Sequence, residues 1–460
     1  MTTATAPAPL PIGHLTDPVC GIVRDVRPVP HPAGAPPRYT AMTADVSDAR
    51  RFGAWPADRV SLGTTFGDPD GARIAAVAEA VERYCGNRLP PPGHPRAPRR
   101  ATAAELTSEG HRVYGPGEVP AYADWQYARP GFPYRPLTPD TPALWTPADE
   151  NGQPCWVPVA LSHLNWRQGP LRELPRTHHL NYAGIATGRG LDDAAERGLL
   201  ETVERDALEL WWHLEGPTRG IDLDSVPGLA GDLAGCSLEI SAVELPSEFA
   251  PCAAALVHDP ARGLYAAGFA CRYDPAEAVR KAVLEAVHTW VFTQGTTDPD
   301  GWVFRAVDAG LLARGLYFDH RADRRYLDDC GDDFAAVRDL GAQVQVWLDP
   351  RTAPLARRFT RPALGTVPVT DIPAGDRDRL RTALAERGHR VLTVDLTTED
   401  VARTELRVAR TLVTGLIPNA PAAFAYFGSP RFATAAVERG WRAEPPARAA
   451  DFTLVPPPHM

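Results

Sequence analysis

Residues 194–212, AAERGLLETVERDALELWW, decide the fold of this 460-residue chain. Apolar residues recur there at helical spacing after two aspartates at the place of an N-cap, so the pattern predicts one long helix over Ala194–Trp212. Glu201 and Glu204 are three residues apart and share one face of that helix. Carboxylates in so apolar a helix are costly to bury unless positive charge meets them, and Arg205 follows directly.

The same arrangement of acidic residues occurs earlier in the chain. In residues 74–84, IAAVAEAVERY, Glu79 and Glu82 are three apart and Arg83 follows the second glutamate. The rest of this predicted helix is almost all Ala, Val and Ile. Surface helices are polar over most of one face, so we expect these carboxylates to face a cleft or the interior.

A third helix is predicted over Ala276–Val291, because an aspartate, a proline and a glutamate stand where the N-cap, the first helical position and a capping box require them. It carries Glu285 and His288 at the same three-residue spacing. It also holds Lys281, the only lysine of the chain, which is placed either to contact phosphate as a point charge or to pair with a glutamate one turn away.

Composition narrows the class of protein. The formal net charge of −9 argues against nucleic acid as the main partner. The seven cysteines are scattered without a CxxC pair, so neither a disulfide framework nor a structural zinc site is indicated. The first residues have no basic start and no apolar core, and no apolar run approaches the length of a membrane span. We expect a soluble, cytoplasmic protein.

The remaining segments indicate an alternation of short strands and loops. Strands are predicted over residues 19–26, 39–46, 155–159, 238–245, 253–257, 264–273, 390–396 and 406–412, with a helix over 376–387. Two segments rich in small residues, Gly63–Gly67 and Asn181–Gly188, are expected to be loops that lead into the first and the central helix.

Four carboxylates brought together would repel one another strongly where the dielectric is low. The four are Glu79, Glu82, Glu201 and Glu204. Mg²⁺ relieves such repulsion, because it prefers oxygen ligands and is commonly shared with substrate phosphates. Arg83 and Arg205 are placed to reach phosphate or to hold the carboxylates. The pattern predicts a nucleoside triphosphate held by Mg²⁺, and the chain has neither a P-loop motif nor a kinase motif.

On these residues the chain resembles the YcaO family, in particular the D component of azoline-forming cyclodehydratases. The resemblance is carried by AVAEAVER at 76–83, NYAGIATG at 181–188, LLETVERDA at 199–207 and the helix that bears Glu285. It extends more weakly to FPYRPLT at 132–138, VDLT at 394–397 and GSPR at 428–431. It implies an α+β, YcaO-type mixed α/β fold with an ATP cleft lined by glutamate-bearing helices.

The resemblance also implies an organisation of the chain. We expect a mobile N-terminal tail over residues 1–15 and one YcaO domain over 16–460. Within that domain, residues 16–300 form the nucleotide-binding core with all three glutamate helices, 301–450 a C-terminal α/β part, and 451–460 a Pro-containing tail.

By resemblance, the ligands of Mg²⁺ are Glu79, Glu82, Glu201 and Glu204. The ATP-binding residues are Arg83, Asn181, Asp193, Arg205, Lys281, Glu285 and His288. The implied reaction is ATP-dependent cyclodehydration of a ribosomally made precursor peptide in antibiotic biosynthesis. A Cys, Ser or Thr side chain attacks the preceding amide, whose oxygen is then phosphorylated and leaves as phosphate to give a thiazoline or an oxazoline.

Three positions depart from the family pattern. Ala76 stands where the family usually has Ser, and His288 where it usually has Gln. The chain ends in PPPHM, whereas azoline-forming members often end in PxPxP.

The resemblance implies a separate partner protein, of the E1-like (ThiF-like) kind, that captures the leader peptide. It also allows a flavin dehydrogenase that oxidises the azoline, and a homodimer. Two alternatives stay open: other amide activation by the same ATP chemistry, giving a thioamide or an amidine, and a non-catalytic subunit that binds peptide or a partner.

Overall fold

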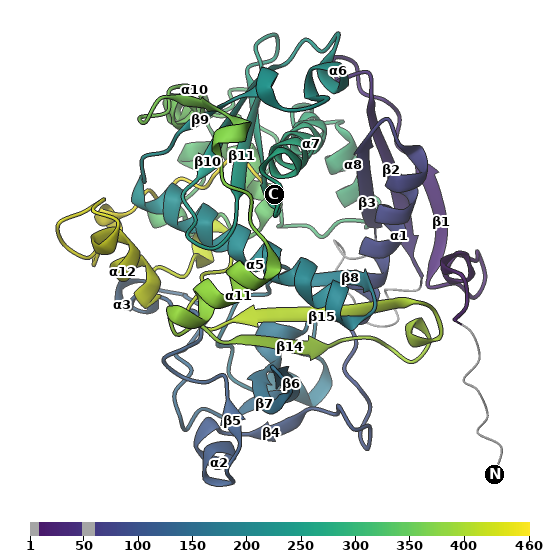
Figure 1. Cartoon of the computed structure of the whole chain (residues 1–460), viewed down its shortest axis with the longest axis vertical. Coiled ribbons are helices and arrows are strands. Elements are labelled where there is room, and N and C mark those ends of the chain that lie inside the picture. The colour runs from purple at the N-terminus through teal and green to yellow at the C-terminus, as the bar shows by residue number, and fades with distance from the viewer. Residues whose placement is uncertain (1–8, 48–59) are drawn as a thin grey trace.

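Three β-sheets and three long helices organise the part of the chain that the structure, a computed structural model, describes: residues 9–47 and 60–460 (Figure 1). Residues 1–8 of the tail expected to be mobile lie outside the described residues. Each long helix follows a strand in sequence and packs against the sheet that the strand belongs to. The chain is a mixed α/β protein, as predicted.

The first sheet is an antiparallel meander in the order β1-β2-β3, formed by β1 (Val23–Pro28), β2 (Tyr39–Val46) and β3 (Val60–Phe66). Helix α1 (Pro69–Gly86) follows and packs on β3 and β2. The Asp68 side chain caps it by accepting a hydrogen bond from Gly71 N at 2.9 Å. The predicted helix and the predicted strand over 39–46 are confirmed.

Both segments expected to be loops contain a strand, and in the second, Asn181–Gly188, the last four residues belong to β8 (Ile185–Arg189). Most of the first is a strand as well. Gly63 to Phe66 belong to β3, and the reason lies in the packing of α1. A Cβ atom on Gly63 would overlap the carbonyl oxygen of Ala72 and the amide nitrogen of Ala76 in that helix. The glycine is therefore required by the close approach of strand and helix, and a turn is not needed to explain it.

The second sheet repeats the plan. Its five strands run in the order β12-β11-β10-β9-β13 and are β9 (Gly220–Asp222), β10 (Glu239–Leu245), β11 (Cys252–Asp259), β12 (Leu264–Cys271) and β13 (Thr366–Pro368), with β13 parallel to β9. Helix α7 (Pro275–Gln294) follows β12 and packs on it. Asp274 caps α7 and Pro275 opens it, as the sequence predicted.

The third sheet joins distant parts of the chain. Its order is β5-β7-β6-β14-β15-β8, with β4 paired to β6. The strands are β4 (Arg99–Ala101), β5 (Arg112–Val113), β6 (Ala143–Glu150), β7 (Gln153–Pro158), β8 (Ile185–Arg189), β14 (Val391–Asp395) and β15 (Leu406–Val413). Two strands from beyond residue 390 thus lie between strands from before residue 190.

Helix α5 (Leu191–Leu214) follows β8 and runs through the middle of the molecule (Figure 1). Its apolar residues pack with those of β10, β11 and β12 in one cluster that includes Trp211, Trp212 and Phe269. The predicted helix is confirmed, but the expected aspartate N-cap is wrong. The N-cap is Gly190, whose φ of 99° starts the helix at Leu191, and Asp193 instead accepts a hydrogen bond from Arg189 N at 2.9 Å.

The remaining helices are shorter. They are α2 (Ala103–Ser108), α3 (Asp124–Tyr127), α4 (Val159–Ser162), α6 (Leu229–Leu233), α8 (Trp302–Asp308), α9 (Leu340–Val346), α10 (Arg357–Thr360), α11 (Arg377–Glu386) and α12 (Pro430–Glu438).

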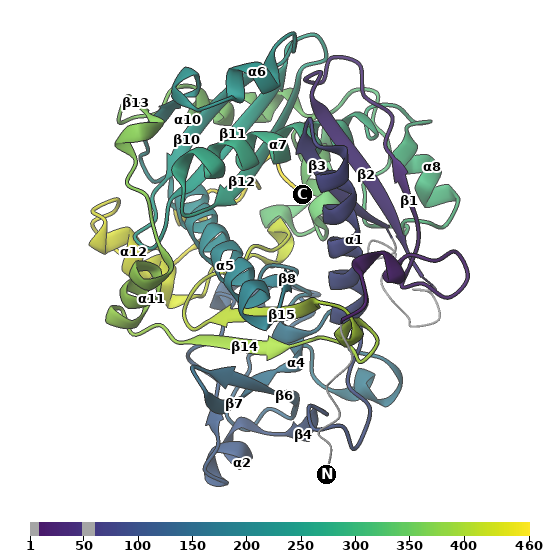
Figure 2. The ribbon, with the colours of Figure 1, turned by 45° about the vertical axis from the view of Figure 1, so that its right-hand side comes forward.

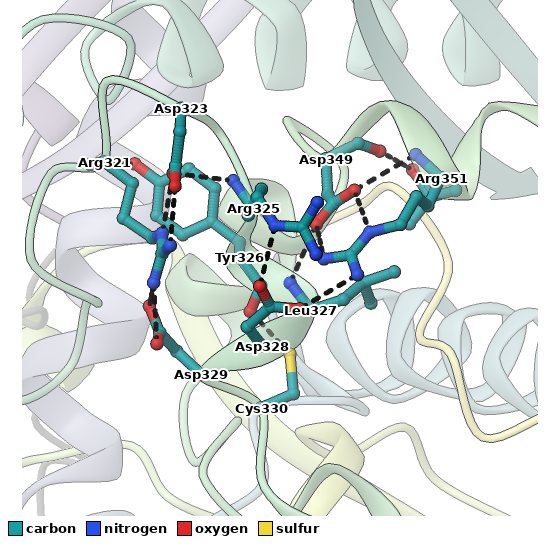
Figure 3. A network of polar contacts seen from close by, with 11 residues as sticks. Arg321, Asp323, Arg325, Tyr326, Leu327, Asp328, Asp329, Cys330, Asp349 and Arg351 are labelled. Carbon is teal, nitrogen blue, oxygen red and sulfur yellow. Dashed lines mark hydrogen bonds and ion pairs between the residues drawn. The ribbon is translucent and has the colours of Figure 1, made fainter.

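The segment between α8 and α9 is held by a network of ion pairs (Figure 3). Arg321 binds Asp323 and Asp329 at 2.8 and 2.9 Å, and Arg351 joins Asp328 to the buried Asp349. Because α9 follows this segment directly, the network fixes where α9 lies.

The last residues of the chain are buried. Trp212 Nε1 donates to the carbonyl of Val455 and Trp347 Nε1 to that of Pro456, both at 2.7 Å. Ala267 N, on the edge of β12, donates to Pro458 O at 2.6 Å. In both views of the ribbon the C-terminus lies between α1, α5 and α7 (Figures 1 and 2).

Candidate functional site

Each of the four predicted glutamates has one carboxylate oxygen held by a main-chain N–H from another segment. On α1, Glu79 accepts from Leu62 N at 3.0 Å and Glu82 from Thr187 N at 2.8 Å. On α5, Glu201 accepts from Gly184 N at 3.1 Å and Glu204 from Cys271 N at 3.0 Å. A carboxylate fixed by one oxygen presents its second oxygen in a defined direction.

An arginine on the same helix faces the second oxygens. Arg83 Nη2 lies 2.9 Å from Glu79 Oε1. Arg205 reaches both glutamates of α5, with Nη2 3.5 Å from Glu201 Oε1 and Nη1 3.2 Å from Glu204 Oε1. The residue that follows each Glu pair in the sequence therefore compensates part of its charge.

The two pairs meet across the segment Gly184–Thr187. This segment bonds Glu201 at its first residue and Glu82 at its last. Burial raises the pKa of Glu82 to about 8; Arg83 opposes the shift, and the charges of Glu79 and Glu201 add to it. The charge of a carboxylate on α5 thus acts on a carboxylate of α1.

Helix α7 brings the third part of the site. Burial raises the pKa of Glu204 to about 8; Arg205 opposes the shift, and the charge of Glu285 adds to it. Glu285 itself lies 3.1 Å from Lys281 Nζ. Burial favours its neutral form, but Lys281 and Arg205 outweigh burial and lower its pKa.

His288 connects α7 to α1. Its Nδ1 lies 3.2 Å from the hydroxyl of the buried Tyr39 on β2. Burial lowers the pKa of His288, while the charges of Glu79 and Glu285 oppose that shift. A neutral imidazole, oriented by a tyrosine and flanked by carboxylates of two helices, therefore occupies the place where we noted a departure from the family pattern.

The C-terminal segment supplies a residue that the sequence analysis did not identify as part of the site. His459 Nε2 lies 3.2 Å from Arg205 Nη1, and His459 Nδ1 lies 3.1 Å from the carbonyl oxygen of Ala267. Burial lowers the pKa of His459 to about 4, so the ring is neutral at pH 7. Its Nδ1–H donates to Ala267 O and its Nε2 accepts from Arg205. The histidine after the proline run was the available signal.

Asn181 and Asp193 have different surroundings. Asn181 is buried, and its Oδ1 accepts from Ala183 N at 2.8 Å beside the segment that holds Glu201. Asp193 bonds Arg189 N and Arg197 Nε at the start of α5. Glu201 is eight residues further on, about 12 Å along the helix axis at 1.5 Å per residue. The contacts of Asp193 therefore belong to the helix start.

The GSPR segment also finds its place. Arg431 Nη2 lies 2.8 Å from Asp206 Oδ2, and both side chains are buried. Asp206 is the residue after Arg205, so this ion pair fixes α5 to the start of α12 from the side opposite the glutamates. The segment has a structural role in the support of the central helix.

These residues fit Mg²⁺ and a triphosphate. Within residues 9–47 and 60–460, no three His, Cys, Asp or Glu side chains are grouped closely enough to hold a metal by themselves. Mg²⁺ does not need such a cage, because it keeps several waters and is bound by one or two carboxylates together with substrate phosphates. The raised pKa values of Glu82 and Glu204 show buried carboxyls that nearby arginines compensate only in part. No helix of the described residues is long and apolar enough to cross a membrane.

The chain is similar to known proteins in sequence and in fold. Residues 66–417 match the family model described as YcaO cyclodehydratase, ATP- and Mg²⁺-binding. A curated uncharacterized protein of Methanothermobacter thermautotrophicus is 26% identical over 233 residues, which cover 47% of this chain and 54% of that protein.

Among solved structures, a heterocyclase in complex with substrate and cofactor is similar with a TM-score of 0.70 and 20% identity, over 97% of this chain and 56% of that one. The heterocyclase TruD gives 0.56 and 20%, over 85% and 51%. YcaO from Methanopyrus kandleri, bound with AMPPCP and Mg²⁺, gives 0.52 and 17%, over 87% and 90%. At these identities the likeness shows the fold. The chain spans about half the length of the curated relative and of both heterocyclases.

Proposed function

This chain belongs to the YcaO family, whose members bind ATP and Mg²⁺, and from that premise we propose that it is an ATP-dependent peptide cyclodehydratase. Its substrate is a ribosomally made precursor peptide. Its products are thiazolines from Cys and oxazolines from Ser or Thr.

The proposed reaction activates an amide oxygen. The side-chain sulfur or oxygen of the substrate residue bonds to the carbonyl carbon of the preceding amide, and the former carbonyl oxygen takes the γ-phosphoryl group of ATP, which releases ADP. Phosphate then leaves with that oxygen, a proton leaves the nitrogen, and the C=N bond of the azoline forms. An amide oxygen is a poor leaving group and phosphate a good one, so the activation is chemically required.

In this proposal the four glutamates hold Mg²⁺ through the oxygens that the main chain leaves free. Mg²⁺ neutralises charge at the transferring phosphoryl group. Arg205 and Lys281 contact the phosphates, with Arg83, Glu285 and His288 at the edge of the nucleotide site. Catalysis then rests on positioning and electrostatics, and the hydrogen bonds to Leu62, Gly184, Thr187 and Cys271 supply the positioning.

One observation carries the proposal: in two Glu-x-x-Glu-Arg pairs on separate helices, a main-chain N–H group holds one oxygen of each glutamate, and the segment Gly184–Thr187 bonds one glutamate of each helix. A structural role alone does not explain why Glu82 and Glu204 are buried with only partial compensation, since the charges of Glu79 and Glu201 disfavour the ionised form of Glu82, and those of Glu201 and Glu285 that of Glu204. A divalent cation removes that conflict.

A separate protein that binds the leader peptide, of the E1-like kind, is part of the proposal. The two heterocyclase chains are about twice as long as the part that this chain matches, which leaves room in them for a further unit. A flavin dehydrogenase that oxidises the azoline, and a homodimer, are further proposed partners.

The test is mass spectrometry of a candidate precursor peptide after incubation with this protein, its partner, ATP and Mg²⁺. Loss of one water per modified residue, with release of phosphate, supports azoline formation. Replacement of oxygen by sulfur indicates a thioamide instead, and loss of water through a peptide amine an amidine. Glu82→Gln is the matched inactive control. Tight ATP binding without turnover with any partner and peptide would favour the non-catalytic subunit.

A further inference from the structure

Arg410, on β15, is a buried arginine whose charge has no ion-pair partner in the described part of the chain. The residue is 1% exposed. Its Nη1 donates to the carbonyl oxygen of Asn181 at 2.9 Å, and its Nε has no hydrogen-bond partner. The ion pairs found within 4.0 Å among residues 9–47 and 60–460 do not include it. A buried charge in this state is unfavourable unless the surroundings supply the opposite charge.

The acidic side chain that acts on Arg410 is that of Glu201. Burial lowers the pKa of Arg410 to about 10, and the charge of Glu201 is the first of the influences that oppose this shift; the others come from Tyr114 and Tyr426, which are neutral. The charge of Arg410 also acts on His163, whose ring is neutral because burial lowers its pKa to about 3. Among the groups that act on Arg410, the candidate Mg²⁺ ligand Glu201 is thus the carboxylate.

Arg410 is also bonded to the segment Asn181–Gly184, which orients Glu201. Its side chain holds the carbonyl of Asn181, and the next residue of β15, Thr411, donates its N–H to Gly184 O at 2.8 Å. The strand therefore fixes both ends of Asn181–Gly184. Gly184 N in turn bonds Glu201 Oε2 at 3.1 Å. Arg410 thus holds one end of the segment that carries the donor to this carboxylate, and the charge of the same carboxylate acts on Arg410.

We propose that Arg410 is a positioning residue of the Mg²⁺·ATP site, which fixes the Asn181–Gly184 segment and balances the charge of Glu201 so that the free oxygen of Glu201 is directed at the metal. The proposal rests on the proposed function, since it assumes that Glu201 binds Mg²⁺. Residues behind metal ligands commonly change metal affinity by about 10- to 100-fold when replaced.

The first experiment measures binding of AMPPCP to the full chain over a series of Mg²⁺ concentrations. Arg410→Gln is expected to raise the Mg²⁺ concentration needed for half-maximal binding by about tenfold or more, with binding restored at saturating Mg²⁺. The control is Arg407→Gln on the same strand, whose guanidinium bonds the carbonyls of Thr404 and Leu406. A purely structural role for Arg410 would lower the folded fraction and leave the Mg²⁺ requirement unchanged. A folded Arg410→Gln with a Mg²⁺ requirement within about twofold of wild type overturns the inference.

The second experiment tests the link to Glu201 without nucleotide. Urea unfolding is compared for wild type, Arg410→Gln, Glu201→Gln and the double variant. We expect the loss in midpoint caused by Arg410→Gln to shrink in the Glu201→Gln background, and the double variant to fold even if Arg410→Gln alone does not. Equal losses in both backgrounds, or failure of both variants to fold, overturn the inference. Wild type that binds no AMPPCP at any Mg²⁺ concentration contradicts the proposed function, while this cycle still decides the role of Arg410.

Discussion

Helices α1 and α5 carry the same Glu-x-x-Glu-Arg sequence in two different surroundings. In both, main-chain N–H groups bind one oxygen of each glutamate, and burial raises the pKa of the second glutamate to about 8. The arginines differ. Arg83 contacts Glu79 and lies 4.4 Å above the ring of Tyr182, whereas Arg205 contacts Glu201, Glu204 and His459.

The same motif is thus enclosed to a different degree in the two helices. The side chain of Arg205 is 13% exposed and its Nε is buried without a partner, so α5 forms the enclosed centre of the site. The side chain of Arg83 is 22% exposed, and α1 lies at one side of the site under the edge of β8. We infer that α5 determines the rigidity of the site and that α1 completes it from the side.

Neutralisation of one glutamate in each helix tests whether both helices contribute to the proposed Mg²⁺ site. Glu82→Gln and Glu201→Gln are each expected to lower ATP turnover with peptide and partner by about 10²–10³-fold or more, because each removes a proposed ligand of the Mg²⁺ at the transferring phosphoryl group. Phosphate release measures this. The control is Glu277→Gln, which changes an exposed glutamate in the first turn of α7. Near-normal turnover in both site variants would exclude the ligand assignment.

Removal of the two arginines should separate the helices by stability. Arg205→Ala leaves Glu201 and Glu204 without their cation in a buried place, and loss of one partner of a buried ion pair typically costs about 3–5 kcal/mol. Arg83→Ala removes a more exposed pair and a cation–π contact, for which we expect about 1 kcal/mol. Urea unfolding gives both free energies. Equal losses in the free energy of unfolding for the two variants would mean that the greater burial of Arg205 does not affect stability.

The buried second glutamates should give both helices the same pH dependence. The pKa of Glu82 and Glu204 rises from 4.5 to about 8 on folding, so between these pH values the folded protein holds protons that the unfolded chain has released. The metal-free protein is therefore expected to lose stability as pH rises from 4.5 to about 8, by at most about 1.4 kcal/mol per pH unit per carboxyl.

Unfolding in urea and EDTA at several pH values measures this loss. Glu82→Gln and Glu204→Gln should each flatten the profile, and a profile that rises with pH would contradict the shifts.

The last prediction concerns the contact of α5 with the C-terminal segment. His459→Ala removes the acceptor for Arg205 Nη1 and the donor to Ala267 O, and loss of buried hydrogen bonds of this kind costs about 1–2 kcal/mol. We expect that destabilisation together with weaker AMPPCP binding. His14→Ala, at an exposed position, is the control. An unchanged affinity would show that Arg205 needs no support from the C-terminal segment.

Local patterns in the sequence predicted the helices well. The apolar spacing and the Asp274-Pro275 start of α7 gave an element that the structure reproduces within a few residues, because caps and helical periodicity depend on neighbours in sequence. The glutamate pairs were identified for the same reason, since residues three apart share a face. Their assignment as Mg²⁺ ligands remains a prediction.

Contacts between segments far apart in sequence could not be predicted from these local patterns. Nothing near Gly63 indicates that α1 presses on it, so a strand was interpreted as a loop. The pairing of β15 with β8 joins residues more than two hundred positions apart. Arg410 and His459 were missed because an arginine in a strand and a histidine after prolines acquire their meaning only from the segments that fold against them.

The contact between Gly63 and α1 has a consequence for how such a site can change during evolution. Leu62, the neighbour of Gly63, donates the N–H that orients Glu79, so the position of the strand determines the position of the carboxylate. Even a methyl group at Gly63 would drive the helix outward and withdraw Glu79 from its donor. A site for a larger cation or nucleotide would therefore have to arise by exchange of side chains, because the distance between β3 and α1 cannot increase in small steps.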